Sequence, residues 1–313
     1  MRLFLFTLFV VVTILLPGRI VFAATVPGGV VVSPAFQDIT LDEQNTKTDF
    51  FVSIKNTGET STTLRITVYD FGSLDESGGV AFLGATNDLE KKYALASWIR
   101  PEKDVFMLEP GEEKKILVTI ENREGLSPGG HYGALMFRAE NGSGDAVGKE
   151  NAISVNQLFS TLLFVRKTGG EIYDLKLNKQ EYDNNLVAFQ DILRLRFQNN
   201  GNIHVTPRGL VSVSDPFGRI VAKGIINEES SIILPETFRV YPVHFKTLLQ
   251  SFIPGRYTIE TSYRFDRKDD FSVSTLQFYY VPLPSTLGGV ALIILVGFRV
   301  KRYRKKGSKQ PKV

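Results

Sequence analysis

The sequence predicts an all-β protein, made of two tandem β-sandwiches followed by one C-terminal transmembrane helix. Three observations predict this fold class. Short segments in which apolar and polar residues alternate recur between turn motifs, as in half-buried β-strands. The order of these segments and turns occurs twice along the chain. A single long apolar run then precedes a strongly basic C-terminus.

The N-terminus, residues 1–23, is typical of a secretory signal peptide. Arg2 gives it a positive start, and the apolar run Leu3–Leu16 is too short to span a bilayer comfortably. We expect cleavage after Ala23. The alternative is an uncleaved anchor helix, which Pro17-Gly18 disfavours because this pair breaks a helix where a signal should end.

The first predicted domain, residues 24–168, contains segments with a period of two. In Thr62–Tyr69 the apolar residues Leu64, Ile66 and Val68 alternate with polar ones. Lys114–Ile120 alternates in the same way after a glycine turn. Tyr132–Phe137 and Val155–Arg166 are two further predicted strands, and Leu89–Trp98 is predicted to form a short helix or an ordered excursion.

The second predicted domain, residues 171–282, repeats the punctuation of the first. Asn199-Asn200-Gly201 repeats Asn56-Thr57-Gly58, and Asp215-Pro216-Phe217-Gly218 repeats Asp70-Phe71-Gly72. The main difference is an insertion in the first copy at about 73–106. This repeat predicts tandem immunoglobulin-like sandwiches, joined by a linker at Thr168-Gly169-Gly170.

The turn motifs have structural explanations. Each Pro-Gly turn precedes a tyrosine, Tyr132 in one copy and Tyr257 in the other. We expect each tyrosine hydroxyl to bond back to the backbone of its corner. The Asn-x-Gly turns are predicted to be hairpins in which glycine or asparagine supplies a positive φ.

The C-terminus predicts a transmembrane helix over residues 283–300 and a basic cytoplasmic tail over 301–313. The apolar run Leu287–Phe298 needs extension to about 20 residues to cross the hydrocarbon layer. The basic residues that follow favour a cytoplasmic C-terminus, so the bulk of the chain is expected outside the cell. The alternative is a buried strand or helix of a soluble domain, which would leave eight cations from Arg299 onward beside it.

The start of this helix resembles a sortase sorting signal, in which Leu-Pro-x-Thr-Gly is followed by an apolar run and a basic tail. Here the motif is Leu283, Pro284, Ser285 and Thr286, with Leu287 where the glycine should be. The resemblance implies covalent attachment to the cell wall after cleavage behind Thr286. Because the glycine is missing, a plain membrane anchor is the preferred prediction.

Charge and composition exclude several functions. The chain has 37 Lys+Arg, 33 Asp+Glu and no cysteine. Ten of the cations lie in the two terminal segments, which leaves a charge of about −6 on the residues between them, so no nucleic-acid binding is expected. Without cysteine there is no thiol catalysis or disulfide. We expect no enzyme activity, no cofactor and no metal.

Candidate chemistry is sparse. His131 lies beside glycines without a nucleophile or an orienting acid in any motif, and His204 and His244 lack metal-ligand spacing. The acidic run Asp266–Asp270 is interrupted by cations, which disfavours a calcium site. Asn141-Gly142-Ser143 fits a glycosylation sequon or an ordinary hairpin loop.

Trp98, the only tryptophan, lies in the insertion. It is expected either in a core or lid, or as a stacking surface for a sugar. Trp98, His131 and Tyr132 are therefore the weak candidates for ligand binding.

Several motifs of the first domain resemble those of bacterial WxL-interacting surface proteins. They are Val32-Ser33-Pro34 with Phe36, Asn56-Thr57-Gly58, Ala96-Ser97-Trp98-Ile99, Phe106–Glu112 and Pro128–Ala134. The resemblance implies peptidoglycan binding by the first domain and binding of partner surface proteins or host ligands by the second. The first domain is also distantly similar to periplasmic pilus chaperones.

The predicted function is that of a non-enzymatic, membrane-anchored bacterial surface protein. It is expected to bind peptidoglycan or other surface proteins through sheet faces or edges. One alternative is an assembly factor of the pilus-chaperone type, which acts by strand donation. The other is a wall-active enzyme with an unrecognised site.

Overall fold

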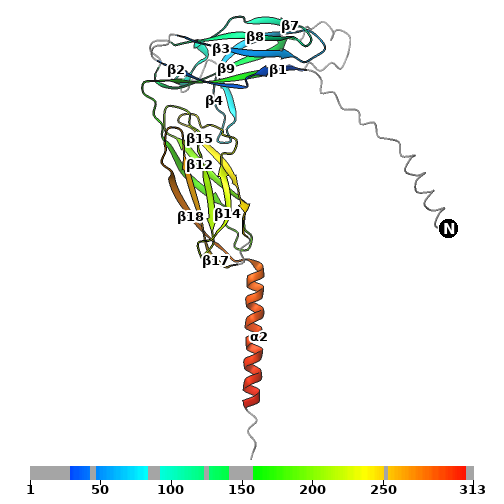
Figure 1. Ribbon diagram of the computed structural model, residues 1–313, viewed down its shortest axis with the longest axis vertical. Helices are drawn as coiled ribbons and strands as arrows, with labels where there is room; N and C mark the ends of the chain where they lie inside the picture. The colour runs from blue at the N-terminus through cyan, green and yellow to red at the C-terminus, as the bar shows by residue number, and fades with distance from the viewer. Residues whose placement is uncertain are drawn as a thin grey trace, which may run out of the picture.

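The computed structural model describes residues 29–42, 47–83, 92–122, 127–140, 158–249 and 253–307. The predicted fold class is confirmed, since the chain is nearly all β-strand with several sheets and one C-terminal apolar helix (Figure 1). The predicted signal peptide at 1–23 and the sequon at 141–143 lie outside the described residues.

The first sandwich has two sheets. One sheet has the order β1 (Val30–Ser33), β3 (Lys47–Asn56), β8 (Glu113–Glu121) and β6 (Ile99–Pro101). The other has the order β2 (Phe36–Leu41), β10 (Leu158–Lys167), β9 (Gly129–Glu140), β4 (Thr62–Ser73) and β5 (Val80–Leu83), with β7 (Val105–Leu108) also on β4. The alternating residues face inward as predicted, and Leu64, Ile66, Ile116 and Val118 form part of one core.

The second sandwich repeats this plan. Its smaller sheet has the order β11 (Leu175–Tyr182), β12 (Ile192–Asn199) and β15 (Phe238–His244). Its larger sheet has the order β16 (Lys246–Thr247), β14 (Ile220–Ile226), β13 (Arg208–Ser214), β17 (Gly255–Arg264) and β18 (Ser272–Tyr280). A separate core lies between these two sheets, around Leu195, Phe197, Val211 and Ile259.

The prediction that the Asn-x-Gly turns are hairpins is wrong. Each turn joins strands of different sheets, β3 to β4 and β12 to β13. Neither glycine has a positive φ. Instead, each asparagine is buried, and its amide donates to two backbone oxygens, those of Thr60 and Leu108 for Asn56 and those of Ile203 and Ile233 for Asn199. The asparagine is present because a buried corner needs its backbone polar groups satisfied.

The described part of the insertion contains β5, β6 and a short 3-10 helix, η2 (Ala96–Trp98). The predicted ordered excursion therefore ends in one helical turn before β6. Asp70, at the end of β4, accepts hydrogen bonds from the backbone N–H groups of Leu95 and Ala96 at 2.7 and 2.6 Å. This carboxylate ties the start of η2 to the sheet, and the insertion thereby covers one side of the first core.

Helix α2 (Leu283–Gly307) begins where the sequence predicts, with Pro284 in its first turn. It continues beyond the predicted end at residue 300, because the Lys and Arg residues that follow are good helix formers. The segment Leu283–Arg304 is long and apolar enough to cross a membrane, and none of its apolar window is buried inside the protein.

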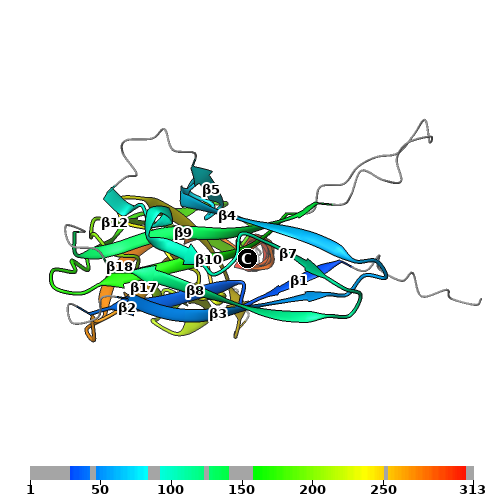
Figure 2. The same ribbon diagram turned by 90° about the horizontal axis from the view of Figure 1, so that it is seen from above.

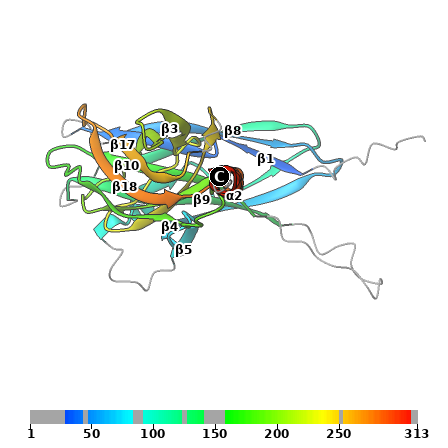
Figure 3. The same ribbon diagram turned by 90° about the horizontal axis from the view of Figure 1, so that it is seen from below.

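The two sandwiches form an L. In Figure 1 the strands of the second sandwich run along the long axis of the molecule, and α2 continues this axis. Figures 2 and 3 look along α2, and both show strands of the first sandwich running across this direction. The inner corner of the L is therefore the place where the two sandwiches meet.

Candidate functional site at the junction of the two sandwiches

At the two Pro-Gly corners, different residue types bond back to the carbonyl four residues earlier in the chain. As predicted, the Tyr257 hydroxyl donates to the carbonyl of Ile253 at 2.8 Å. In the first sandwich the equivalent bond is made by His131, whose Nε2 lies 2.9 Å from the carbonyl of Ser127. Both pairs are four residues apart, so the predicted match of Tyr257 with Tyr132 is wrong by one residue.

This shift places His131 and Tyr132 on opposite faces of β9. His131 faces the core of the first sandwich, where its ring packs on Trp98 with 4.6 Å between ring centroids. Burial lowers the pKa of His131. Trp98, His131 and Tyr132 are all almost completely buried. Binding of an external ligand by these residues stays a prediction, and it would require the domain to open.

Tyr132 lies at the centre of an aromatic cluster between the two sandwiches. Phe71, Tyr132, Ala134 and Phe164 of the first sandwich are buried together, and Ile232 and Leu234 of the second pack against them. The Phe71 and Phe164 rings meet edge-on at 5.2 Å. Because aromatic side chains bury large apolar areas, this cluster stabilises the contact between the two sandwiches.

A polar chain crosses the same contact. The Tyr132 hydroxyl lies 3.2 Å from Nδ1 of His204, a buried residue of the second sandwich. Nε2 of His204 lies 3.7 Å from the carboxylate of Asp38, which Arg166 also binds at 2.7 Å. His204 is thereby held between two groups of the first sandwich.

The protonation of this chain follows from its surroundings. Burial raises the pKa of Tyr132 well above its ordinary value, so the phenol keeps its proton and can donate it to Nδ1. Burial also raises the pKa of Asp38, but the bonds from His204 and Arg166 outweigh that effect, and the net shift is downward. Asp38 is therefore ionised at neutral pH and faces the Nε2 side of the imidazole.

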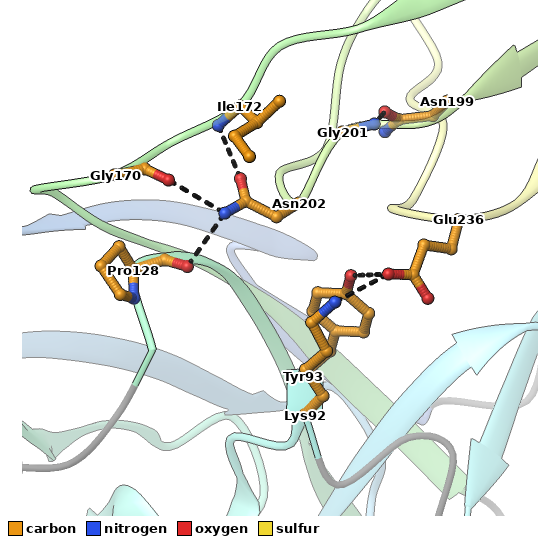
Figure 4. Close-up of polar contacts among 9 residues, drawn as sticks. All are labelled: Lys92, Tyr93, Pro128, Gly170, Ile172, Asn199, Gly201, Asn202 and Glu236. Carbon is orange, nitrogen blue, oxygen red and sulfur yellow. Dashed lines mark hydrogen bonds and ion pairs between the residues drawn. The ribbon is translucent and has the colours of Figure 1, made fainter.

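Asn202 acts as a latch between the first sandwich, the linker and the second sandwich (Figure 4). Its side-chain amide donates to the carbonyls of Pro128 at 3.2 Å and Gly170 at 3.0 Å, and its Oδ1 accepts from the N–H of Ile172 at 2.7 Å. The N–H of Gly130 donates to its carbonyl at 2.8 Å. Every polar group of this side chain is therefore used at the junction.

Two ion pairs flank the cluster. Lys92 and Tyr93, just before η2, both donate to one carboxylate oxygen of Glu236, at 2.7 and 2.8 Å (Figure 4). Arg196 on β12 binds both carboxylate oxygens of Glu76 in the turn between β4 and β5, at 2.7 and 2.6 Å. These bonds lower the pKa of Glu76 and of Glu236. The contact between the two sandwiches thus consists of a buried apolar cluster with one ion pair on each side of it.

The residues of this site have structural roles at the contact between the two sandwiches. The Tyr132 phenol is buried and keeps its proton, so it is a poor nucleophile. Among the residues that the structure describes, no group of three His, Asp or Glu side chains could hold a metal ion. In the predicted acidic run, Asp266 accepts the backbone N–H of Thr206 at 2.8 Å, a structural role.

The sequence patterns did not single out Phe51 as an exposed aromatic residue that could bind a ligand. Phe51 on β3 is 60% exposed and faces outward, because its neighbours Val52 and Ile54 face the core. Leu117 of β8 lies opposite it in the sheet. The period-two pattern of this strand, with Val52 and Ile54 inward, already predicts Phe51 on the outer face. Phe51 lies on the sheet that does not contain β10, the strand before the linker.

No protein-family model and no curated protein matches this chain. Among solved structures it is similar to the class 5 fimbriae chaperone CfaA, at 13% identity and a TM-score of 0.40, over 82% of this chain and 100% of that chain. It is also similar to the E. coli chaperone DraB, at 13% identity and a TM-score of 0.37, over 80% and 95%. A PapD-like domain of human CEP192 matches 45% of this chain and 87% of its own length, at 15% identity and a TM-score of 0.30.

Proposed function

We propose that this chain is a non-enzymatic, single-pass membrane protein of a bacterial cell surface, which holds a binding domain at a set distance and angle from the bilayer. The observation that carries this proposal is α2, an apolar helix whose membrane-length segment is not buried by the sandwiches. An apolar surface of this size is stable only when lipid or another protein covers it.

The junction supports the same proposal. A surface receptor tethered through a flexible linker would need no contacts between its domains. Here an aromatic cluster, the Asn202 latch and two ion pairs fill the contact between the sandwiches. These contacts keep the first sandwich across the axis of α2, and its outer sheet is left free for a ligand.

The ligand we propose for this sheet is peptidoglycan, in line with the resemblance of the first domain to WxL-interacting proteins. Phe51 supports this, because sugars stack on exposed aromatic rings and neighbouring polar groups can bond their hydroxyls. Asp49 and Thr119 lie next to it on the same sheet and bond each other at 2.6 Å.

The test is co-sedimentation of the detergent-solubilised full chain with insoluble peptidoglycan, compared with Phe51→Ser. We expect saturable binding by the parent and a loss of most of it in the variant. The matched control is Phe271→Ser in the second sandwich, where the phenylalanine is 55% exposed against 60% for Phe51. No binding by the parent at moderate salt would reject peptidoglycan, and release of sugar or peptide would reject the non-enzymatic proposal.

A second candidate function is the binding of a partner strand, as in pilus-chaperone-type assembly. Strand β10 pairs with β9 along its whole length but with β2 only from Leu162 onward. Residues 158–161 therefore have one sheet edge without a partner in the described part of the chain, and such an edge can accept a strand.

A proline at residue 160 tests this candidate. The N–H of Leu162 points towards β2, where it donates to the carbonyl of Ala35, so the N–H of Ser160, two residues earlier, points to the same edge. Ser160→Pro removes this donor without breaking a bond to β9. Loss of a co-purifying subunit in this variant would support strand pairing, and an unchanged set of partners would exclude it.

A further inference from the structure

The lower end of the second sandwich carries exposed apolar side chains around the start of α2. Strand β18 ends at Tyr280, and α2 begins at Leu283. Helix α2 leaves the sandwich at this end (Figure 1). The side chains come from the loop between β11 and β12, the turn between β13 and β14, and the two residues after β16. Their exposed apolar residues are Leu186, Val187, Phe217, Leu248 and Leu249.

Backbone contacts fix two of these loops beside the helix. The N–H of Val281, just before α2, donates to the carbonyl of Leu186 at 2.6 Å. Tyr280 pairs with Gly255, and a Cβ on Gly255 would lie only 2.7 Å from the ring of Pro216. The loop of Leu186 and the turn of Phe217 are thus in contact with the last residues of the sandwich before the helix.

Residues Leu248 and Leu249, after β16, are held at the same end of the sandwich. The N–H groups of Leu248 and Leu249 both donate to the carbonyl of Val221, at 2.8 and 3.1 Å. Val221 lies at the start of β14, directly after the turn that carries Phe217. The backbone N–H groups of Leu248 and Leu249 are therefore bonded within the sandwich, whereas their side chains are exposed on its outside.

Phe217 is presented by a turn that is already formed. The buried Asp215 carboxylate accepts the N–H groups of Phe217 and Arg219 and binds the Arg219 guanidinium at 2.7 Å. The two charges of the turn therefore neutralise each other, and the phenylalanine at its tip is 73% exposed. A rigid turn with a paired charge and an exposed aromatic tip suits an interface between water and an apolar phase.

The repeat gives an independent argument. Phe71, in the aspartate–phenylalanine motif of the first sandwich, lies within β4 and is buried among aromatic residues of its own sheet and Ile232 and Leu234 of the second sandwich. Strand β4 ends on the side of the first sandwich where β10 leaves for the linker, and the turn of Phe217 lies on the side of the second sandwich where β18 leaves for α2. At the corresponding end of the second sandwich, the membrane-length helix α2 follows β18 directly. If α2 is the proposed membrane anchor, it brings a bilayer to the side of the sandwich that carries Phe217.

We propose that the lower loops of the second sandwich, through Phe217, Leu186, Val187, Leu248 and Leu249, sit in the interfacial layer of the lipid bilayer beside α2. The inference rests on the proposed membrane anchor. Seating these loops gives the second sandwich several contacts with the bilayer besides the short connection at Val281 and Pro282. The sandwich then stands upright, and the angle of the junction becomes an angle relative to the membrane.

The test measures tryptophan quenching by brominated phosphatidylcholine in proteoliposomes of the full chain. Phe217→Trp reports on the lower loops, and Leu292→Trp reports on insertion of the helix. Phe271→Trp, in the turn between β17 and β18 at the opposite end of the same sandwich, is the matched control. Trp98, buried in the first sandwich, supplies a constant background that the parent chain measures.

We expect bromolipid to quench the probes at 217 and 292 and to leave the probe at 271 unquenched. Quenching at 292 without quenching at 217 would overturn the seating of the loops and leave the anchor standing. Quenching at 271 as well as 217 would also overturn it, because the sandwich would then lie on its side. No quenching at 292 would overturn the anchor and, with it, this inference.

Discussion

At the scale of single residues, the two corners show how one backbone geometry accepts two side chains. Tyr257 and His131 each bond to a carbonyl four residues earlier. The tyrosine reaches it with a hydroxyl and the histidine with a ring nitrogen. Only the histidine can gain a charge near neutral pH, so only the first sandwich acquires a pH dependence from its corner.

Tyr257→Phe should lower the free energy of unfolding of the second sandwich by about 1 kcal/mol, the typical net contribution of one buried hydrogen bond. The ring stays in place, and the bond to the Ile253 carbonyl is lost. Urea unfolding measures the change. Tyr279→Phe, at an exposed position, is the control and should leave the value unaltered. Equal effects of the two changes would contradict this role of the corner.

The His131 corner predicts a pH dependence of stability. Its folded pKa is lowered by burial from the ordinary 6.5, so below that pH the unfolded chain binds more protons than the folded one. The stability of the first sandwich should therefore fall as the pH drops through 6.5 and towards the folded value.

His131→Phe should flatten this pH dependence while losing the bond to Ser127, at a cost of about 1 kcal/mol near neutral pH. The measurement is the urea midpoint at several pH values between about 7.5 and about 5.5, the range in which histidine titrates. Tyr279→Phe, the exposed control used above, should keep the slope of the parent. A slope that survives in His131→Phe would place its origin elsewhere.

At the scale of elements, the residues that resemble a sorting signal form the first turn of α2. The Ser285 and Thr286 hydroxyls donate to the carbonyls of Pro282 and Leu283, at 2.7 and 2.8 Å. The Pro282 carbonyl also accepts the backbone N–H groups of Ser285 and Thr286, so this segment has the bonding of a helical first turn. The Thr286–Leu287 bond therefore lies inside a helix, whereas a cleaved segment must fit an enzyme cleft in an extended form.

Thr286→Ala should leave the anchoring of the chain unchanged, because a membrane helix does not depend on this hydroxyl. Cell fractionation measures it. Both the parent and the variant should be extracted by detergent and remain in the membrane fraction. A parent that stays with the wall after detergent treatment, and is released by this substitution, would establish sorting in place of the plain anchor.

At the scale of the whole molecule, the junction of the L contains carboxylates that neutral pH keeps charged. The pKa values of Asp38, Glu76 and Glu236 are lowered in the folded chain. A carboxylate of this kind stabilises the folded arrangement above its unfolded pKa, and that contribution disappears as the pH falls through the lower folded value. The junction should therefore loosen in acid before the cores unfold.

Distances between spin labels at Lys55→Cys and Lys223→Cys would measure this loosening. The chain contains no cysteine, so both labels are unique. We expect a narrow distribution at neutral pH that broadens once the pH is below 3.8, the ordinary value for Asp38. Asn202→Ala should broaden it already at neutral pH, because it removes the bonds to Pro128, Gly170 and Ile172. A narrow distribution throughout would show that apolar packing alone holds the angle.

Local patterns in the sequence determined much of this molecule. Alternation with period two placed Leu64, Ile66 and Val118 in a core, because a strand turns successive side chains to opposite faces. The apolar run before the basic tail predicted α2 and its start at Leu283, because crossing a bilayer needs a helix of a certain length. The repeat of turn motifs predicted two sandwiches of one plan.

Only the tertiary structure decided what those patterns leave open. A shift of one residue sends His131 to a core and Tyr132 to the junction, and both assignments fit the same sequence motif. His204 meets a tyrosine 72 residues earlier in the chain, and Glu236 meets Lys92 across a separation of 144. Such contacts depend on how two finished sandwiches pack, and packing between domains leaves no period in the sequence. The angle of the L, and with it the direction in which Phe51 faces, therefore follows from the assembled junction.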